Sequence, residues 1–342
     1  MADRGPSRST GIEDEEAGEP EGEPPFASVL PPELAPTWPA PRRAVLGPDG
    51  GALAFVECAV ARGFLGGLAR IPRGFRDPLV AGLARLAKAA DRRRSQAARV
   101  FLRQALGPEL GGPDLERRVL QAWRHLFRVT LDAEILHRHV DFTRLRDHLE
   151  MDVCEDWQRV LDSDRGSILA TPHVGDWETG SAVLPWIGFD PFYAVAKPPK
   201  NRWLSVHMHR VRERRGVRLL PRRGAMRDAP SIVRAGGMLG LMLDQRARKR
   251  PLLAPFFGRP ARCDRTAAVL LKRLRVPVVV GACYLTAIPW RWRVRVPVVL
   301  WPADLEGKSV EEVTARINLE FEKLILEAPD QYFWLHDRYR GA

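Results

Sequence analysis

Short apolar segments alternate with helix-forming stretches after residue 150, and this alternation restricts the fold of the 342-residue chain more than any other feature. The expected strands are Ser167–Pro172, Pro191–Ala196, Arg218–Pro221, Met238–Asp244, Val276–Leu285 and Trp292–Leu300. The helix-forming stretches between and after them are Trp177–Trp186, Arg202–Arg215, Arg227–Arg234, Arg265–Arg275 and Val310–Glu327. This order predicts an α/β fold with a largely parallel central sheet flanked by helices. In such sheets, sites lie at the carboxyl ends of the strands.

The remainder of the chain divides into two further expected regions. Residues 1–41 are rich in Pro, Gly and Glu, which predicts a disordered acidic leader. Residues 42–150 place apolar side chains at helical spacing, so we expect a helical N-terminal region with membrane-interface contact. The α/β catalytic region would then occupy 151–342. Residues 51–71 are apolar but interrupted by charges, which favours an interfacial or packed helix over a span of ~20 uninterrupted apolar residues.

The charge of the chain is unevenly distributed. Residues 1–25 carry eight acidic and two basic side chains, and the whole chain carries +12, so the rest carries +18. Such a surplus favours anionic partners, such as an acidic membrane face, a phosphorylated lipid or an acidic carrier protein. The same surplus is also compatible with a non-catalytic basic protein that binds anionic lipid or nucleic acid. The affinity of such a protein for its ligand would fall steeply as the salt concentration rises.

Several enzyme classes lack their signature in this sequence. The four cysteines form no CxxC pair, which argues against a zinc site or a disulfide framework. No Gly-x-Ser-x-Gly elbow of a serine hydrolase occurs, and Gly307-Lys308-Ser309 lacks the upstream glycine of a P-loop. The two His-x-His pairs, at 137/139 and 207/209, would point their rings apart on a helix. We therefore expect neither a metal nor a cofactor.

The end of the first expected strand carries the most informative polar side chains. His173 follows the strand through Thr171-Pro172, and Glu178 falls in the first turns of the next helix. A carboxylate beside an imidazole fixes its tautomer and stabilises the imidazolium, so such a pair can act as a general base. We predict His173 as the base and Glu178 as its partner, with Asp176 as a rival. A Glu178 that only stabilises a helix N-terminus is the alternative interpretation.

Polar residues also end a second strand. Asp244 and Gln245 close an apolar segment at another carboxyl edge, where they would bind substrate, or Asp244 would cap a helix. The basic loop at 246–250 is suited to an anionic headgroup or an acidic carrier. The segment Pro255–Gly258 would line an acyl channel or form a packed turn. The period-two alternation of Trp290–Pro297 predicts a strand with one buried face.

Five segments occur in an order and rough spacing that point to one family. They are Thr171–Glu178, Arg214–Ala225, Gly236–Gln245, Pro255–Gly258 and Pro329–Arg338. Through them the chain resembles the lysophospholipid acyltransferase superfamily. It is most similar to the lauroyl/myristoyl acyltransferases of lipid A biosynthesis and the related mannolipid acyltransferases. The resemblance runs from about Ala81 to Arg340. The acidic leader and the weakly apolar 51–71 segment depart from the family pattern.

The resemblance implies transfer of a fatty acyl chain from a thioester, either acyl carrier protein or acyl-coenzyme A, to a hydroxyl of an anionic membrane glycolipid such as a lipid A precursor. His173 matches the catalytic histidine of the family, and Glu178 matches its acidic partner. The thioester would be a co-substrate, with no cofactor and no nucleic acid partner. The protein would work at the cytoplasmic face of the inner membrane, as a peripheral or monotopic protein. Substrate-binding candidates are Arg215, Arg222, Arg223, Asp244 and Gln245.

Overall fold

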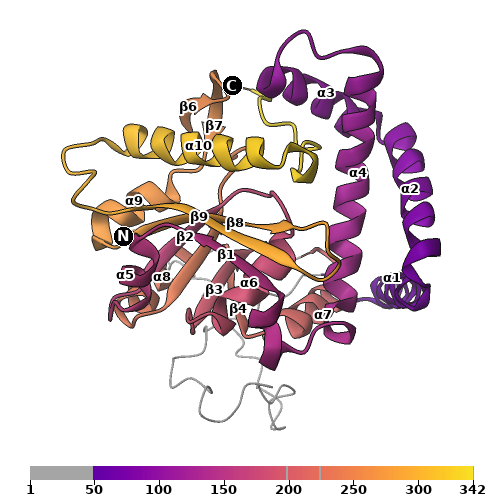
Figure 1. Ribbon diagram of the computed structural model, residues 1–342, viewed down its shortest axis with the longest axis horizontal. Helices are drawn as coiled ribbons and strands as arrows, with labels where there is room; N and C mark the ends of the chain where they lie inside the picture. Colours follow the sequence, from indigo (N-terminus) through magenta and orange to yellow (C-terminus); the bar gives the residue numbers. More distant parts are fainter. Residues whose placement is uncertain (1–48, 198, 223–224, 342) are drawn as a thin grey trace, which may run out of the picture.

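The structure is a computed structural model that describes residues 49–197, 199–222 and 225–341, and a seven-stranded sheet forms its centre (Figure 1). In spatial order the strands are β1 (Leu149–Val153), β9 (Trp292–Leu300), β8 (Val278–Leu285), β2 (Ser167–Thr171), β5 (Met238–Met242), β3 (Phe192–Ala196) and β4 (Val217–Pro221). The last five run parallel, whereas β9 is antiparallel to β8, and β1 is parallel to β9. The predicted α/β fold with a largely parallel sheet is therefore confirmed.

Helices cover both faces of the sheet. Alternate residues of each strand point to opposite sides, and the apolar side chains on each side need a helix to pack against. Leu169 of β2 packs in one apolar cluster with α5 (Asp156–Leu161) and α6 (Trp177–Trp186). Ile168 and Ala170 of the same strand belong to a second cluster. That cluster includes residues of α8 (Ala225–Arg234), α9 (Thr266–Leu274) and α10 (Val310–Glu327). Both faces of the central strands are therefore buried, as the near-continuous apolar sequence of β2 and β5 requires.

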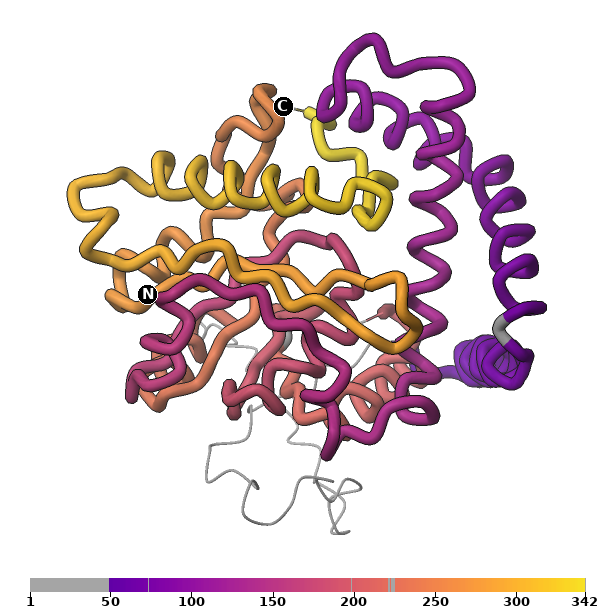
Figure 2. Tube along the Cα trace, in the orientation of Figure 1, coloured from indigo at the N-terminus to yellow at the C-terminus, as the bar shows by residue number. Residues whose placement is uncertain are grey.

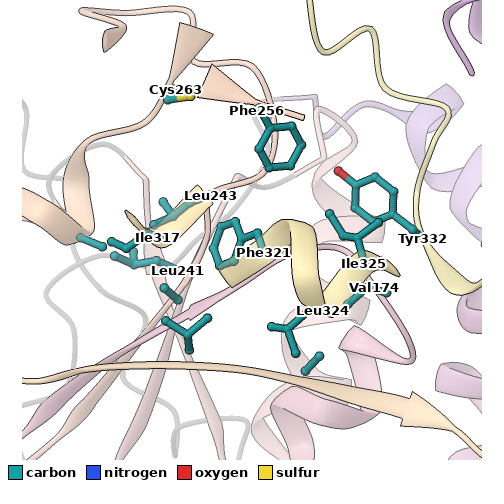
Figure 3. Close-up of a cluster of buried hydrophobic side chains, with 14 of the residues drawn as sticks. Val174, Leu241, Leu243, Phe256, Cys263, Ile317, Phe321, Leu324, Ile325 and Tyr332 are labelled. Atoms are coloured by element: carbon teal, nitrogen blue, oxygen red, sulfur yellow. The ribbon is translucent and has the colours of Figure 1, made fainter. Parts of the chain in front are cut away.

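Helix α10 covers the second face of the sheet, to which Ile168 and Ala170 point. Its buried residues Ile317, Phe321, Leu324 and Ile325 lie in one cluster with side chains of β5 and of the hairpin formed by β6 (Leu252–Phe256) and β7 (Arg259–Cys263) (Figure 3). Ser309 caps this helix in a capping box with Glu312. The cap and the apolar stripe together fix the helix across the sheet.

In the part of the chain that the structure describes, four helices precede the sheet, within the region for which helices were expected. They are α1 (Ala52–Arg70), α2 (Arg73–Ala90), α3 (Arg92–Leu106) and α4 (Gly112–Ile135), followed by short 3₁₀ turns at Leu136–Arg138 and Phe142–His148. Helix α4 packs against α2, α3 and α6, and it stands upright beside the sheet in Figure 1. The tube in Figure 2 shows α1 end-on, at the outer side of the molecule. Among the described residues, α1 alone is long and apolar enough to cross a membrane.

Several predicted boundaries differ from the structure by one or two residues, and two segments form strands that were not predicted. Strand β1 begins at Leu149, so the segment expected to be helical up to residue 150 ends in a strand at the far edge of the sheet. The stretch after residue 250, expected as loop and turn, forms the β6–β7 hairpin instead. Helix α7 (Arg202–Glu213) ends two residues before the expected Arg215. The predicted leader, residues 1–41, lies outside the described residues.

Candidate active site

Two neighbouring parallel strands bring His173 and Asp244 together. Strand β2 pairs with β5 in a register that places Thr171 opposite Met242. His173 and Asp244 each stand two residues beyond that last pair, so both project from the same edge of the sheet. His173 Nδ1 lies 2.6 Å from Asp244 Oδ1, and the backbone N–H of His173 donates to Asp244 Oδ2 at 3.0 Å. The carboxylate is thus bound at both oxygens by a single residue.

These contacts assign the tautomer of the histidine. Because the Asp244 carboxylate accepts a hydrogen bond, His173 Nδ1 carries the proton and Nε2 presents its lone pair. The Gln245 amide Nε2 lies 3.3 Å from His173 Nε2, as a donor to that lone pair. The rings of Trp177 and Phe333 pack beside the imidazole, with centroids 5.6 and 6.0 Å away. The exposed fraction of the His173 side chain is 18%, so its free nitrogen remains reachable.

The Asp244 carboxylate is held in its ionised form although it is buried. Its side chain is 2% exposed, and burial alone would raise its pKa. The His173 imidazole, the His173 backbone N–H and a hydrogen bond from the Tyr332 hydroxyl outweigh this effect, and the pKa of Asp244 lies below its ordinary value. Asp244 therefore remains a hydrogen-bond acceptor throughout the neutral pH range.

Glu178, the predicted partner of His173, makes a different contact. Its carboxylate receives Arg212 Nη2 at 2.7 Å and Arg212 Nε at 3.2 Å, a two-point ion pair between α6 and α7. The prediction that Glu178 hydrogen-bonds the imidazole was therefore wrong. The two residues are close in sequence, but the α6 N-terminus separates them, and the neighbouring strand supplies the carboxylate instead. Glu178 lies in the first turn of α6, where it lines a cavity that is described below.

The rival carboxylate, Asp176, has a structural position. It caps α6 by accepting the Thr179 N–H at 3.0 Å, and its second oxygen accepts the Trp292 indole N–H at 3.0 Å. The residue is fully buried, and this burial raises its pKa to about 6 despite the two donors. Asp176 therefore fixes the start of the helix that follows it rather than the orientation of His173.

The two predicted arginines that the structure describes, Arg215 and Arg222, lie in different environments. Arg215 is 4% exposed, and its guanidinium donates to the Ala133 carbonyl of α4. Burial lowers the pKa of Arg215, although the nearby carboxylate of Glu178 opposes that effect. This arginine therefore fastens α7 to α4 behind the Glu178–Arg212 pair. Arg222 is exposed in the turn after β4, the outermost strand, and Arg223 lies outside the described residues.

The loop after Gln245 is held by a second imidazole. His336 Nε2 accepts the backbone N–H of Arg246 at 2.9 Å, which ties the C-terminal segment to the loop that carries the dyad. Burial lowers the pKa of His336 to about 4, so the ring stays neutral and available as an acceptor. The Pro255–Gly258 segment comprises the end of β6 and the two-residue turn of the β6–β7 hairpin, with Phe256 fully buried. These residues are thus packed at the hairpin turn. They do not line the cavity described next, so they form no channel wall there.

An apolar cavity of about 130 Å³ lies under the sheet beside the dyad. Its walls come from five strands and from α5, α6 and α7, and two of its lining residues, Thr171 and Trp177, adjoin His173. Glycines at 180, 240 and 281 leave the space open. A Cβ at Gly240 would approach the Phe192 ring to 2.5 Å, which shows how closely the walls are packed there. The mainly apolar lining of this cavity is suited to a hydrocarbon group rather than to a charged one.

The sequence interpretation missed three residues of this site. Asp244 was considered for substrate binding rather than as the partner of His173, and Tyr332 and Arg212 were not considered. The signal that points to Asp244 is its position two residues beyond the last β2–β5 pair, because His173 stands at the same distance beyond that pair on the other strand. That signal becomes readable only when the two strands are known to be neighbours, because 71 residues separate His173 from Asp244.

The fold and the dyad define an α/β protein with an imidazole and a carboxylate arranged as general-base enzymes arrange them. The model of the family described as bacterial lipid A biosynthesis acyltransferase matches residues 56–341, so the chain belongs to this family of acyltransferases.

Among curated relatives, the chain is 24% identical over 242 residues to the lipid A biosynthesis palmitoleoyltransferase of Escherichia coli (strain K12), which covers 68% of this chain and 74% of the relative. It is 28% identical over 224 residues to the phosphatidylinositol mannoside acyltransferase of Mycolicibacterium smegmatis, covering 64% and 68% of the two chains.

Proposed function

We propose that this protein transfers a fatty acyl chain from a thioester, on acyl carrier protein or coenzyme A, to a hydroxyl of a membrane glycolipid. The observation that carries the proposal is the His173–Asp244 dyad, in which His173 Nε2 keeps its lone pair, while the neighbouring Trp177 ring lines an apolar cavity. Both named relatives are acyltransferases of glycolipids, a lipid A species in one and a phosphatidylinositol mannoside in the other.

In the proposed reaction, His173 Nε2 takes the proton from the acceptor hydroxyl as its oxygen attacks the thioester carbonyl. A carbon–oxygen bond forms, and the electron pair of the carbonyl moves to its oxygen. When the tetrahedral intermediate collapses, the carbon–sulfur bond breaks, and the imidazolium returns the proton to the departing thiolate. General-base catalysis of this kind supplies about 10²–10⁴-fold in rate.

Asp244 and Gln245 have separate roles in this proposal. Asp244 holds the Nδ1 proton and stabilises the imidazolium by charge, at a contact of 2.6 Å. The Gln245 amide occupies the space that the acceptor hydroxyl must enter, at 3.3 Å from Nε2. Once displaced, that amide N–H becomes a donor for the developing oxyanion. The acyl chain would lie in the apolar cavity between the sheet and α6.

Helices α1 and α2 supply the membrane contact in this proposal. On α1 an exposed stripe at helical spacing comprises Leu53, Val56, Val60 and Phe64. On α2, Phe75 and Leu86 are 76% and 68% exposed. Basic side chains at Arg62 and Arg85 adjoin these stripes and favour an anionic lipid surface. The protein would bind the cytoplasmic face of the inner membrane, either lying on it through these helices or inserting α1.

The test is a transfer assay with purified protein, radiolabelled acyl thioester and glycolipid acceptor in mixed micelles. His173→Ala should lower the initial rate by at least about 10²-fold while far-UV circular dichroism and vesicle binding stay unchanged. His209→Ala is the matched control, because His209 pairs with Glu213 on α7 away from the dyad. Retention of full transfer activity by His173→Ala would refute the proposal.

A further inference from the structure

A second cavity, of about 660 Å³, opens between α2, α4 and the β8–β9 connection. Its volume falls in the range of sites for small molecules and headgroups, about 300–1,000 Å³. Unlike the apolar cavity under the sheet, it is lined mainly by polar and charged side chains of α2 and α4, together with Thr286 and Gln331. The proposed mechanism assigns no role to it.

Guanidinium groups dominate one wall of this cavity. Arg76 is 4% exposed and lies 3.7 Å from Asp132, which also accepts Arg128 Nε at 3.3 Å. Arg124 lies one helical turn before Arg128, and its Nε is buried without a hydrogen-bond partner among the described residues. Two guanidinium groups therefore share one carboxylate on this wall, and Arg124 adds a third positive charge with a buried donor that remains to be satisfied.

The acids on the remaining wall do not cancel this surplus. Asp330 lines the cavity but ion-pairs with Arg118 at 3.0 Å. Asp77 also lines the cavity and has an interaction of its own. An oxyanion with several acceptor atoms would satisfy Arg124 and relieve the crowding of like charge around Asp132.

A single indole separates this cavity from the dyad. His125 lines the cavity, its ring packs edge-on against Trp177 at 5.7 Å, and Trp177 packs against His173 at 5.6 Å. His125 Nε2 also contacts the carbonyl of Gly175, two residues beyond His173, at 2.9 Å. A ligand in the cavity would therefore be linked to His173 through the rings of His125 and Trp177.

Helix α2 also places this cavity at the level of a lipid surface. Arg76 and Val80 face the cavity, whereas Phe75 and Leu79 on the same turns are 76% and 40% exposed. If the exposed side enters a bilayer, as proposed above, the cavity lies at headgroup depth.

From this placement we propose that the cavity binds a phosphate ester carried by a substrate, with Arg124 as its main ligand and Arg128 in support. The inference rests on the proposed function for its substrate. The same chemistry has two sources, a phosphate on the glycolipid headgroup and the phosphate of the phosphopantetheine arm of the donor. The exposed face of α2 favours the headgroup.

The test is isothermal titration calorimetry of the full chain with inorganic pyrophosphate, glucose 1-phosphate and 4′-phosphopantetheine at low ionic strength. Arg124→Gln should raise the dissociation constants about tenfold, because it removes charge-assisted hydrogen bonds. Gln121→Glu should weaken binding by a similar factor, because it adds a carboxylate to the wall with little change in shape. Arg117→Gln is the control, because Arg117 lies on α4 but is exposed and pairs with Asp114. Thermal unfolding of each variant checks that it folds.

The outcomes separate this inference from the proposed function. His173→Ala should bind pyrophosphate like the wild type, so the site stands even if no acyl transfer is found. Tighter binding of glucose 1-phosphate would assign the headgroup as the source, and tighter binding of 4′-phosphopantetheine would assign the donor. Absence of pyrophosphate binding by the wild type, or equal loss in Arg117→Gln and Arg124→Gln, would overturn the inference.

Discussion

The two cavities beside Trp177 differ in the properties that select a ligand. The one under the sheet is about 130 Å³ and is lined mainly by apolar side chains and glycines of five strands and of α5, α6 and α7. The one between α2 and α4 is about 660 Å³ and bounded by arginines and aspartates. The sheet core thus provides a space for hydrocarbon, and the N-terminal helices provide a space for charge. In the proposed function, the acyl tail and the headgroup of the substrates would therefore be bound by separate parts of the chain.

The largest effect on this comparison should come from filling the apolar cavity. Ala194 of β3 lines it, and Ala194→Leu adds three carbon atoms at that wall. Since each methylene is worth about 0.8 kcal/mol, the preference for a long acyl donor over one three carbons shorter should fall by about 10–100-fold. Competition between two acyl thioesters in one reaction measures the ratio. Ala303→Leu, at an exposed position, should leave the ratio unchanged. An unchanged ratio in Ala194→Leu would mean that the acyl chain lies elsewhere.

A smaller effect should follow from removing the partition between the cavities. Trp177→Ala deletes the indole that contacts both His125 and His173. Water should then reach the dyad, so transfer should fall about tenfold while thioester hydrolysis without acceptor rises. The ratio of free fatty acid to acylated lipid measures this change. Trp203→Ala is the control, because Trp203 packs on Phe55 at the surface. If Trp177→Ala keeps the wild-type ratio, the indole does not separate the two spaces.

The smallest effect on activity should come from changing His125, which lines the cavity between α2 and α4. The effect of this residue on stability should be measurable. Burial lowers its pKa from 6.5 to about 4. The unfolded chain therefore binds a proton that the folded chain excludes between pH 6.5 and pH 4. Stability should fall as the pH drops through this window, by on the order of 2–3 kcal/mol from this residue. His125→Gln should reduce the acid-induced fall of the melting temperature. The exposed His137→Gln should retain the wild-type fall, and an identical fall in both variants would contradict the assignment.

Regular periodicity in the sequence predicted most of the fold. The six expected strands all occur, because each is a continuous or alternating apolar run bounded by polar turns. Strand β9 shows the alternating burial that its Trp-Arg repeat predicts. The edge strand β1 was not predicted, because its three central residues are exposed and carry no apolar pattern. The β6–β7 hairpin was missed for a similar reason, since its side chains pack against α10 rather than into the sheet.

The candidate site was predictable only where one segment defined it. His173 stands out because an apolar strand ends directly before it. Its partner depends on the order of strands, which places β5 beside β2 although two strands and three helices intervene in the chain. Local spacing therefore favoured Glu178, and only the tertiary pairing reveals Asp244. The same reasoning explains Arg215, because its position at the basic end of the expected helix gave no sign that α4 would bury it.

The central claim is that Asp244, rather than Glu178, acts through His173, and a direct comparison of kcat/KM for two isosteric variants tests it. Asp244→Asn removes the charge 2.6 Å from Nδ1 and should lower kcat/KM by about 10³–10⁴-fold, as in other histidine–aspartate pairs. Glu178→Gln breaks only the ion pair with Arg212 and should lower kcat/KM by no more than about tenfold. A loss in Glu178→Gln equal to or larger than that in Asp244→Asn would contradict the account.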